Sequence, residues 1–392
     1  MAFSTAIGCK WETNARKKLE AMIKLFLVCP GLGNVNRGYE SFTRECFDAL
    51  ATHPDLKTSL WKGGGKSAPK EVVLWNLPRE GRAAQWLGGV TRRGRDFVDQ
   101  VTFGLSLLPR ISRLKPDVIY FSDGNLGNIL WQWRRLTRGN YKLLFSNGGP
   151  IAPPFARWDT VQQVAPTHFQ NALNAGESAE KQSVVPYGIR MEREFRPLSP
   201  EERQRVRESL ELPADRPIVL CVAAINKSQK RMDYLVEEVA ALPQPRPFLL
   251  LLGQQDAETP EILQLAQEKL GEGNFALKTV PSSAIGDYYR VSDMFVLASL
   301  SEGLPRSLLE GASYGLSCLA HDYELTRYAL GDYGYFADFT QQGQLMTLLQ
   351  NLLEHPEEES SRGRRHHDIY NRFSWDVLRS QYVAMIQKCR SL

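Results

Sequence analysis

Two glutamates, Glu302 and Glu310, stand eight residues apart in the second half of the chain. The apolar stretch Met294–Leu297 predicts a buried strand, and a polar loop with Glu302 follows it. A helix is expected to begin near Ser307 and to carry Glu310 in its first turn. Carboxylates at these two places can accept hydrogen bonds from the hydroxyl groups of a sugar ring or a ribose.

The start of the same predicted helix offers an anion site. The first N–H groups of a helix have no intrahelical partner and lie at the positive end of the helix dipole. Those around Arg306, Ser307 and Leu308 could therefore hold a diphosphate. Together with the two carboxylates, this site would suit a nucleotide-sugar.

A basic loop predicts a further contact to the same kind of ligand. A strand expected over residues 217–223 leads to Lys227, Lys230 and Arg231, and a helix with apolar spacing begins at Met232. Cations at the start of a helix oppose its dipole, which favours a bound anion there over an ordinary solvated surface.

The elements that must position these residues alternate between strand and helix. Short apolar stretches predict five strands in each half of the chain: 23–29, 72–75, 117–121, 142–145 and 161–165, then 217–223, 247–252, 275–277, 294–297 and 317–321. Helical patterns lie between them, so we expect an α/β protein with two doubly wound parallel sheets. Ligands of such sheets bind beyond the carboxyl ends of the strands.

The domain boundaries follow from the same pattern. We expect a short N-terminal extension over residues 1–21, a first domain over 22–190 and a second domain over 191–372. A final helix over 373–392 is predicted from the serine at its start and the apolar spacing after it.

The composition excludes several classes of protein. The 392 residues are 43% hydrophobic and 23% charged, as in ordinary globular proteins, and no apolar run approaches the ~20 residues of a membrane-spanning helix. The six cysteines form no Cys-x-x-Cys pair, which is typical of reduced thiols in a cytoplasmic protein. We find no Asp-x-Asp motif and no His, Cys and Asp cluster with the spacing of metal ligands, so no metal site is predicted.

The segment around the two glutamates resembles a known family. Glu302, Gly303, Ser307 and Glu310, with the glycines and small residues that follow, look like the glutamate signature of retaining glycosyltransferases with the GT-B fold, especially family four. The resemblance implies two Rossmann-like domains facing a central cleft. It assigns Glu302 to the donor sugar and Glu310 to the ribose. It also implies transfer from a UDP-sugar or GDP-sugar with retention of anomeric configuration, without a metal or another cofactor.

Other segments agree with this resemblance in part. Lys230 matches the family's lysine against the donor diphosphate, but the family's arginine falls on Ala224 or Ile225, so Lys227 or Arg231 would substitute for it. The glycine loop after the first strand resembles the family's N-terminal loop, with Gly33 and Arg37 as candidate binding residues. In the family the final helix crosses back to the first domain.

The first domain departs from the family after its strand at 117–121. Many members carry a histidine there, whereas this chain has Asp123, and Asn147 follows the next strand. Both are candidates for sugar contact or acceptor orientation, placed here with the catalytic residues. The alternative is that the Asp-Gly and Asn-Gly pairs only form turns.

Charge divides the chain and bears on the acceptor. Residues 1–190 hold 26 Lys and Arg against 15 Asp and Glu, and residues 191–392 hold 22 against 29, so the halves carry +11 and −7. The first half interleaves arginines with aromatic residues: Arg79, Arg82, Arg92, Arg93, Arg95, Arg110, Arg113, Arg134, Arg135 and Arg138 with Trp86, Phe97, Phe103, Trp131 and Trp133. Such a surface would suit peripheral docking on an anionic membrane and a lipid-linked acceptor, or a soluble anionic, polysaccharide or small-molecule acceptor.

Two other functions stay open at this point. A GT-B protein that has lost activity could serve as a partner subunit, because the family's arginine and histidine are missing. A nucleic-acid-binding protein could use the basic half, but no helix-turn-helix, RNP-like or zinc pattern accompanies it, so no nucleic-acid partner is predicted.

Overall fold

A computed structural model describes residues 22–35, 37–149 and 151–392, and the predicted extension over 1–21 lies outside the described residues. The chain forms two compact units. One consists of the residues up to Gly188 together with Leu378–Leu392, and the other is Ile189–Val377.

The first unit contains a seven-stranded sheet in the order β3-β2-β1-β4-β5-β6-β7, with all neighbours parallel. Its strands are β1 (Ile23–Cys29), β2 (Leu56–Lys62), β3 (Glu71–Val73), β4 (Val118–Phe121), β5 (Lys142–Asn147), β6 (Thr160–Gln163) and β7 (Gln182–Val184). Its helices are α2 (Gly38–Leu50), α3 (Arg82–Val90), α4 (Arg95–Leu114), α5 (Gly124–Thr137), α6 (Pro166–Asn174) and most of α15 (Trp375–Ser391).

Apolar side chains on alternate strand positions form the core of this unit. Phe103, Leu107 and Ile111 of α4 recur at helical spacing and pack with Ile119 and Phe121 of β4. Elsewhere in the unit, Phe42 of α2 stacks on Tyr187 with ring centroids 4.0 Å apart, and Tyr382 of α15 lies beside Phe42 at 6.1 Å.

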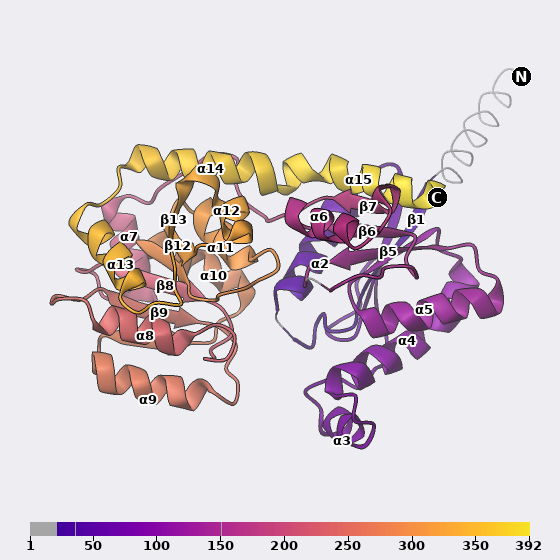
Figure 1. The fold of residues 1–392 in the computed structure, drawn as a ribbon, viewed down its shortest axis with the longest axis horizontal. Coiled ribbons are helices and arrows are strands. Elements are labelled where there is room, and N and C mark those ends of the chain that lie inside the picture. Colours follow the sequence, from indigo (N-terminus) through magenta and orange to yellow (C-terminus); the bar gives the residue numbers. More distant parts are fainter. Residues whose placement is uncertain (1–21, 36, 150) are drawn as a thin grey trace, which may run out of the picture. The chain divides into compact units, whose positions relative to one another are not determined.

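The second unit contains a six-stranded parallel sheet in the order β10-β9-β8-β11-β12-β13. Its strands are β8 (Ile218–Val222), β9 (Phe248–Leu252), β10 (Phe275–Lys278), β11 (Met294–Leu297), β12 (Ser317–His321) and β13 (Gly334–Ala337). The helices are α7 (Pro200–Ser209), α8 (Met232–Ala240), α9 (Thr259–Leu270), α10 (Ile285–Val291), α11 (Arg306–Ser313), α12 (Glu324–Leu330), α13 (Gln344–Glu354) and α14 (Glu359–Phe373). Figure 1 shows helices on both sides of this sheet.

Each sheet has a point at which the strand order reverses. In the first unit β1 lies between β2 and β4, and in the second β8 lies between β9 and β11. The loops after β1 and β4, and after β8 and β11, therefore diverge to opposite faces and leave room for a ligand between them. This topology confirms the predicted fold class and selects the loops in which a site is to be sought.

Candidate donor-binding site in the second unit

Lys230 and Glu302 meet at the switch point of the second sheet. Lys230 follows β8, Glu302 follows β11, and the Lys230 ammonium pairs directly with the Glu302 Oε1 atom. Both side chains are largely buried, with 16% and 13% of their surfaces exposed. Lys230 and Glu302 are 72 positions apart in the sequence, and both were predicted to belong to one site. The structure brings them into contact.

Asn226 holds the loop that presents Lys230. Its Oδ1 atom accepts hydrogen bonds from the backbone N–H groups of Lys230, at 2.9 Å, and Gln229, at 3.3 Å. Its Nδ2 group donates to Asp256 Oδ2 at 3.0 Å. Asn226 is 7% exposed, so these bonds fix the backbone of the loop from within the protein. Asn226 was not predicted as a site residue, although an asparagine directly before the basic loop is typical of an Asx turn.

Tyr323 holds the loop that presents Glu302. Its hydroxyl oxygen accepts the backbone N–H of Glu302 at 2.9 Å, and burial raises the pKa of Tyr323 to about 12. Tyr323 follows β12, the strand next to β11, so only the sheet brings it beside Glu302. No sequence pattern could have indicated this contact.

Glu310 lies in the second turn of α11, not in the first turn as predicted. The helix begins at Arg306, directly after Pro305, which makes Glu310 its fifth residue. The Tyr289 hydroxyl donates to Glu310 Oε2 and the Arg306 Nη2 group donates to Oε1, each at 3.3 Å. Tyr289 is buried and stacks on the half-buried Tyr314 with the rings 5.3 Å apart, so this aromatic pair supports one side of the carboxylate.

The start of α11 provides fewer amides for an anion than the sequence suggested. The N–H of Leu308 already donates to the carbonyl of Pro305 at 3.1 Å. Arg306 and Ser307 are the first two helical residues, and helix geometry gives their N–H groups no intrahelical acceptor. Gly303, three residues earlier, is half-buried in the loop that leads to them.

The other two predicted cations are held away from Glu302. The Lys227 ammonium pairs with Glu261 of α9, and its side chain is 46% exposed. The Arg231 Nη1 group donates to the carbonyl of Phe339 at 2.7 Å, and its guanidinium lies 4.2 Å from the centroid of the Tyr234 ring. Among the three basic candidates, the structure therefore brings only Lys230 to Glu302.

The glycine loop of the first unit packs against a second glycine loop. Gly33 has a φ of +89°, and a Cβ atom on it would lie 2.3 Å from the carbonyl carbon of Gly64. The N–H of Gly64 donates to the carbonyl of Leu32 at 3.0 Å. Only glycine can occupy position 33 without displacing this backbone. Arg37, the residue before α2, is exposed.

Asp123 joins a buried acidic cluster in the first unit. Gln100 Nε2 donates to its Oδ1 atom at 3.0 Å, and burial raises the pKa of Asp123 to about 7. Arg79 opposes this rise, while Glu40 and Asp99 add to it. Glu40, Arg79 and Asp99 are at most 7% exposed, and Arg79 Nε donates to Asp99 Oδ2 at 3.0 Å. The sequence analysis missed this cluster because its members come from four separate segments.

Asn147 is engaged inside the first unit. Its Nδ2 group donates to Gln163 Oε1 at 2.9 Å, its Oδ1 atom accepts the N–H of Ile151 at 2.8 Å, and the residue is 3% exposed. These contacts fix the start of the loop after β5. Its role in sugar contact stays a prediction, and the contacts favour a positioning role.

The basic and aromatic surface is smaller than predicted. Phe103 is fully buried in the core, Arg79 pairs with Asp99, and Arg134 pairs with Asp159. Trp86 and Val90 of α3 are exposed by 68% and 64%. Exposed arginines flank them on α3 and in the segment that leads to α4: Arg82, Arg92, Arg93 and Arg95.

The described residues contain neither a membrane-spanning helix nor a cluster of metal ligands. No described helix has both the length and the apolar character needed to span a membrane. Within residues 22–35, 37–149 and 151–392, no group of three or more His, Cys, Asp or Glu side chains is arranged to hold a metal ion.

Comparison with solved structures defines the class of fold. Sucrose-phosphate synthase from Thermosynechococcus elongatus superposes with a TM-score of 0.77 at 17% identity, over 94% of this chain and 99% of that one. Anabaena HepE, solved in complex with UDP and glucose, superposes with a TM-score of 0.71 at 14% identity, over 94% and 100%. The fold is GT-B.

The sequence of the second unit matches a known family. Residues 202–367 match the family model described as glycosyl transferases group 1. EpsD of Bacillus subtilis (strain 168), which is named as a glycosyltransferase, is 29% identical over 180 residues, or 45% of this chain and 46% of EpsD. The matches span less than half the length of the curated relatives.

Proposed function

We propose that this protein transfers a sugar from a nucleotide-sugar donor to an acceptor. The observation that carries the proposal is the Lys230–Glu302 pair at the switch point of the second sheet, inside the segment that matches the group 1 family. A lysine and a glutamate at the carboxyl ends of neighbouring strands supply what a donor needs at its diphosphate and at its sugar.

In this proposal, different residues of the second unit contact the diphosphate, the sugar and the ribose of the donor. Lys230 and the N–H groups of Arg306 and Ser307 bind the diphosphate and stabilise the negative charge that grows on it as the sugar leaves. Glu302 accepts hydrogen bonds from the sugar hydroxyls, and Glu310 accepts them from the ribose. Because Glu302 holds Lys230 in the described structure, the diphosphate must displace that carboxylate from the lysine.

The finer features of the reaction belong to the same proposal. Retention of anomeric configuration and independence from metals follow from the family that the two glutamates resemble. A UDP-sugar is the first donor to test, because HepE was solved with UDP. A GDP-sugar is the second.

The first unit is proposed to bind the acceptor. Asp123 lies after β4 at the switch point of the first sheet, next to the loop that contains Gly33 after β1. The acceptor is a carbohydrate, polysaccharide, lipid-linked sugar or small molecule. The exposed Trp86 and its neighbouring arginines support peripheral contact with an anionic membrane at its inner face.

Titration calorimetry with UDP-glucose, GDP-mannose and their nucleotides tests the donor site in the full chain. We expect one nucleotide class to bind saturably and Lys230→Met to weaken it at least tenfold. Lys227→Met is the matched control, because this lysine lies on the same loop but pairs with Glu261, and we expect it to change the affinity less than threefold.

Activity requires a second readout. The preferred donor, incubated with the chain and a panel of glycan and lipid-linked acceptors, should give a product whose anomeric configuration is read by NMR. Glu302→Gln should abolish the product. Failure of every UDP- and GDP-sugar to bind would overturn the proposal, and binding without transfer to any acceptor would favour a partner subunit without activity.

A further inference from the structure

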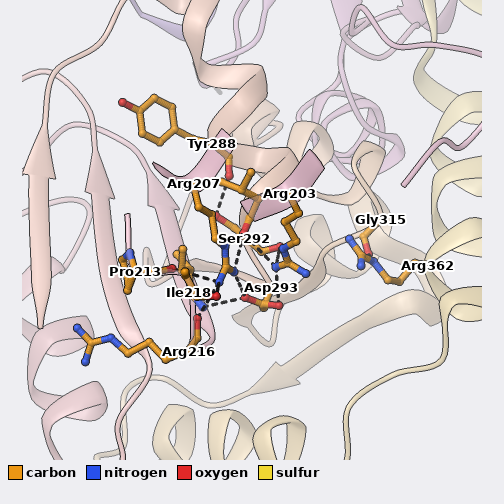
Figure 2. Close-up of polar contacts among 12 residues, drawn as sticks. Arg203, Arg207, Pro213, Arg216, Ile218, Tyr288, Ser292, Asp293, Gly315 and Arg362 are labelled. Atoms are coloured by element: carbon orange, nitrogen blue, oxygen red, sulfur yellow. Dashed lines mark hydrogen bonds and ion pairs between the residues drawn. The ribbon is translucent and has the colours of Figure 1, made fainter. Parts of the chain in front are cut away.

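Two arginines pair with one aspartate at the end of the second sheet opposite the donor-site residues, and a third arginine lies near them. Asp293 directly precedes β11, whereas Glu302 follows that strand. Arg203 and Arg207 come from α7, and Arg362 comes from α14 (Figure 2). Because all strands of this sheet run parallel, the arginine cluster and the Lys230–Glu302 pair lie at opposite ends of the strands, on the order of 15 Å apart.

Arg207 is fully used in holding the fold together. Its Nη2 group donates to Asp293 Oδ2 at 2.8 Å and to the carbonyl of Val291 at 2.8 Å. Its Nη1 group donates to three further carbonyls in the segment before β8, and 6% of its side chain is exposed. This arginine joins α7 to two strands and has no donor left for a ligand.

Only some of the N–H groups of Arg203 donate hydrogen bonds to described protein groups. Its Nη2 group donates to Asp293 Oδ1 at 2.7 Å and to the carbonyls of Val291 and Ser292 at 3.0 and 3.3 Å. Its Nε group is buried and has no hydrogen-bond partner. A buried N–H group without an acceptor costs free energy, and an anion at this position would remove that cost.

Of the three arginines, Arg362 makes the fewest hydrogen bonds to described protein groups. Its Nε group donates to the carbonyl of Gly315 at 3.3 Å, and its guanidinium lies 5.8 Å from the centroid of the Phe195 ring. Among the described residues, no protein group accepts a hydrogen bond from its two terminal amino groups. Figure 2 shows the Arg362 side chain extending toward Arg203.

Among the described residues, the ion pairs in this region leave Arg362 without a carboxylate partner. Arg203 and Arg207 share Asp293, and the neighbouring Arg365 is paired with Glu357 at 2.6 Å. Asp215 and Glu359 attract Arg207 and Arg362 only at longer range. Burial, and after it the charge of Arg203, lower the pKa of Arg362 and of Arg207. The region therefore has more guanidinium groups than directly paired carboxylates, together with unused N–H donors.

We propose that Arg203 and Arg362 form a binding site for a small phosphate-type anion, at the edge of the second sheet opposite the donor site. Arginine suits this role because its planar group donates two parallel hydrogen bonds to a phosphate or sulfate. The ligand is inorganic phosphate or a phosphate monoester. The site does not depend on the proposed transfer reaction.

Titration calorimetry of the full chain with inorganic phosphate, at constant ionic strength, tests this site. We expect saturable binding and a matching rise in melting temperature, because a ligand that binds only the folded state stabilises it. Arg362→Met should weaken phosphate at least tenfold. Arg364→Met is the matched control, because this exposed arginine of α14 donates to Ser361 within its own helix, and its variant should bind phosphate as the original chain does.

Two more variants separate the possible results. Lys230→Met should bind phosphate as the original chain does. Loss of phosphate binding in this variant would show that the anion binds at the donor site, which would overturn the proposal. Arg203→Lys keeps the charge but loses the planar donor pair, and it should weaken phosphate even if Arg362→Met is poorly folded. An unchanged affinity in both arginine variants, or no binding to the original chain, would also overturn it. Tighter binding of glycerol 3-phosphate than of phosphate would identify a monoester as the ligand.

Discussion

Lys230 and Glu302 have opposite effects on the affinity for a nucleotide. In the described structure the carboxylate neutralises the lysine, and both are largely buried. A diphosphate must compete with Glu302 for Lys230 and is also repelled by the carboxylate. Glu302 therefore lowers the affinity for nucleotide, whereas Lys230 raises it.

Glu302→Gln should bind UDP several-fold more tightly than the original chain, although it transfers no sugar. The substitution removes the competing charge and leaves Lys230 available to the phosphate groups. Calorimetry of UDP binding measures the effect. If Glu302→Gln weakens UDP as Lys230→Met is expected to do, the two residues do not compete as described.

Asp123 makes the stability of the first unit depend on pH. Burial raises the pKa of this carboxyl to about 7, whereas an aspartate in an unfolded chain has a pKa of about 3.9. Between these values the folded chain retains a proton that the unfolded chain has released. The free energy of unfolding must therefore fall as the pH rises from about 4 to 7.

Asp123→Asn should remove this dependence. Asparagine keeps an oxygen that can accept the Gln100 hydrogen bond but carries no charge at any pH. We expect the melting temperature of the variant to exceed that of the original chain at pH 8, with a difference that grows from pH 5 to pH 8. Thermal unfolding followed by circular dichroism measures it, and a difference independent of pH would show that the Asp123 carboxyl does not titrate in this range.

At the scale of elements, the turn between β1 and α2 depends on one glycine. Gly33 adopts a positive φ against the backbone of Gly64, whereas a Cβ atom on Gly38, the first residue of α2, would meet no atom within 4 Å. The two glycines are five residues apart in the same loop and helix start, but only the first is required by geometry.

Gly33→Ala should lower the free energy of unfolding by about 1–3 kcal/mol, because alanine would be strained at this φ and would collide with Gly64. Gly38→Ala should leave stability unchanged or raise it slightly, because alanine loses less conformational entropy in a helix. Urea unfolding of both variants compares them. Equal stability of the two would contradict the required close approach.

The strands and the main site residues were predictable from the sequence because their signals are local. Apolar runs located β1, β11 and β12 at the observed bounds, and the loops after β8 and β11 located Lys230 and Glu302. Two edge strands were missed: β7 has only three residues, and β13 has four, all half-buried. β2 was missed because Lys57 and Lys62 interrupt its apolar pattern, although Lys62 is buried against Glu71.

The residues that position the site were not predictable in the same way. Tyr323, Tyr289 and Asn226 act through hydrogen bonds to residues on other strands or helices, or to backbone groups of the same loop. The partners of Tyr323 and Tyr289 become neighbours only when the sheet forms, whereas the Asn226 contacts with Gln229 and Lys230 are local. The arginine cluster around Asp293 was missed for the same reason, since Arg203 of α7 and Arg362 of α14 are 159 positions apart in the sequence.

At the scale of the whole chain, the positive half carries the exposed tryptophan of α3. Residues 1–190 have a net charge of +11, and Trp86 and Val90 are exposed among arginines. A tryptophan beside basic residues favours the interface of an anionic membrane, where the ring enters the headgroup region and the charges meet the lipid phosphates.

The protein should therefore bind vesicles that contain 30% phosphatidylserine more strongly than neutral vesicles, and salt should weaken this binding. Trp86→Ser should reduce the bound fraction several-fold. Leu263→Ser, at an exposed position of α9 in the acidic half, is the matched control and should have no effect. Co-sedimentation measures both. Equal binding of the original chain and Trp86→Ser would show that Trp86 does not contribute to membrane contact.

The order of the two units along the chain has a consequence for biosynthesis. The first unit is interrupted after Gly188 and resumes only at Leu378. In that last segment the Tyr382 hydroxyl donates to the carbonyl of Pro186 at 2.8 Å and accepts a bond from Gln162 at 2.9 Å, and Lys388 donates to the carbonyl of Gln182 at 2.7 Å. The ribosome therefore makes most of the first unit first but supplies its segment Leu378–Leu392 only after the whole second unit. The second unit can fold before that segment leaves the exit tunnel, whereas the first unit is completed only afterwards.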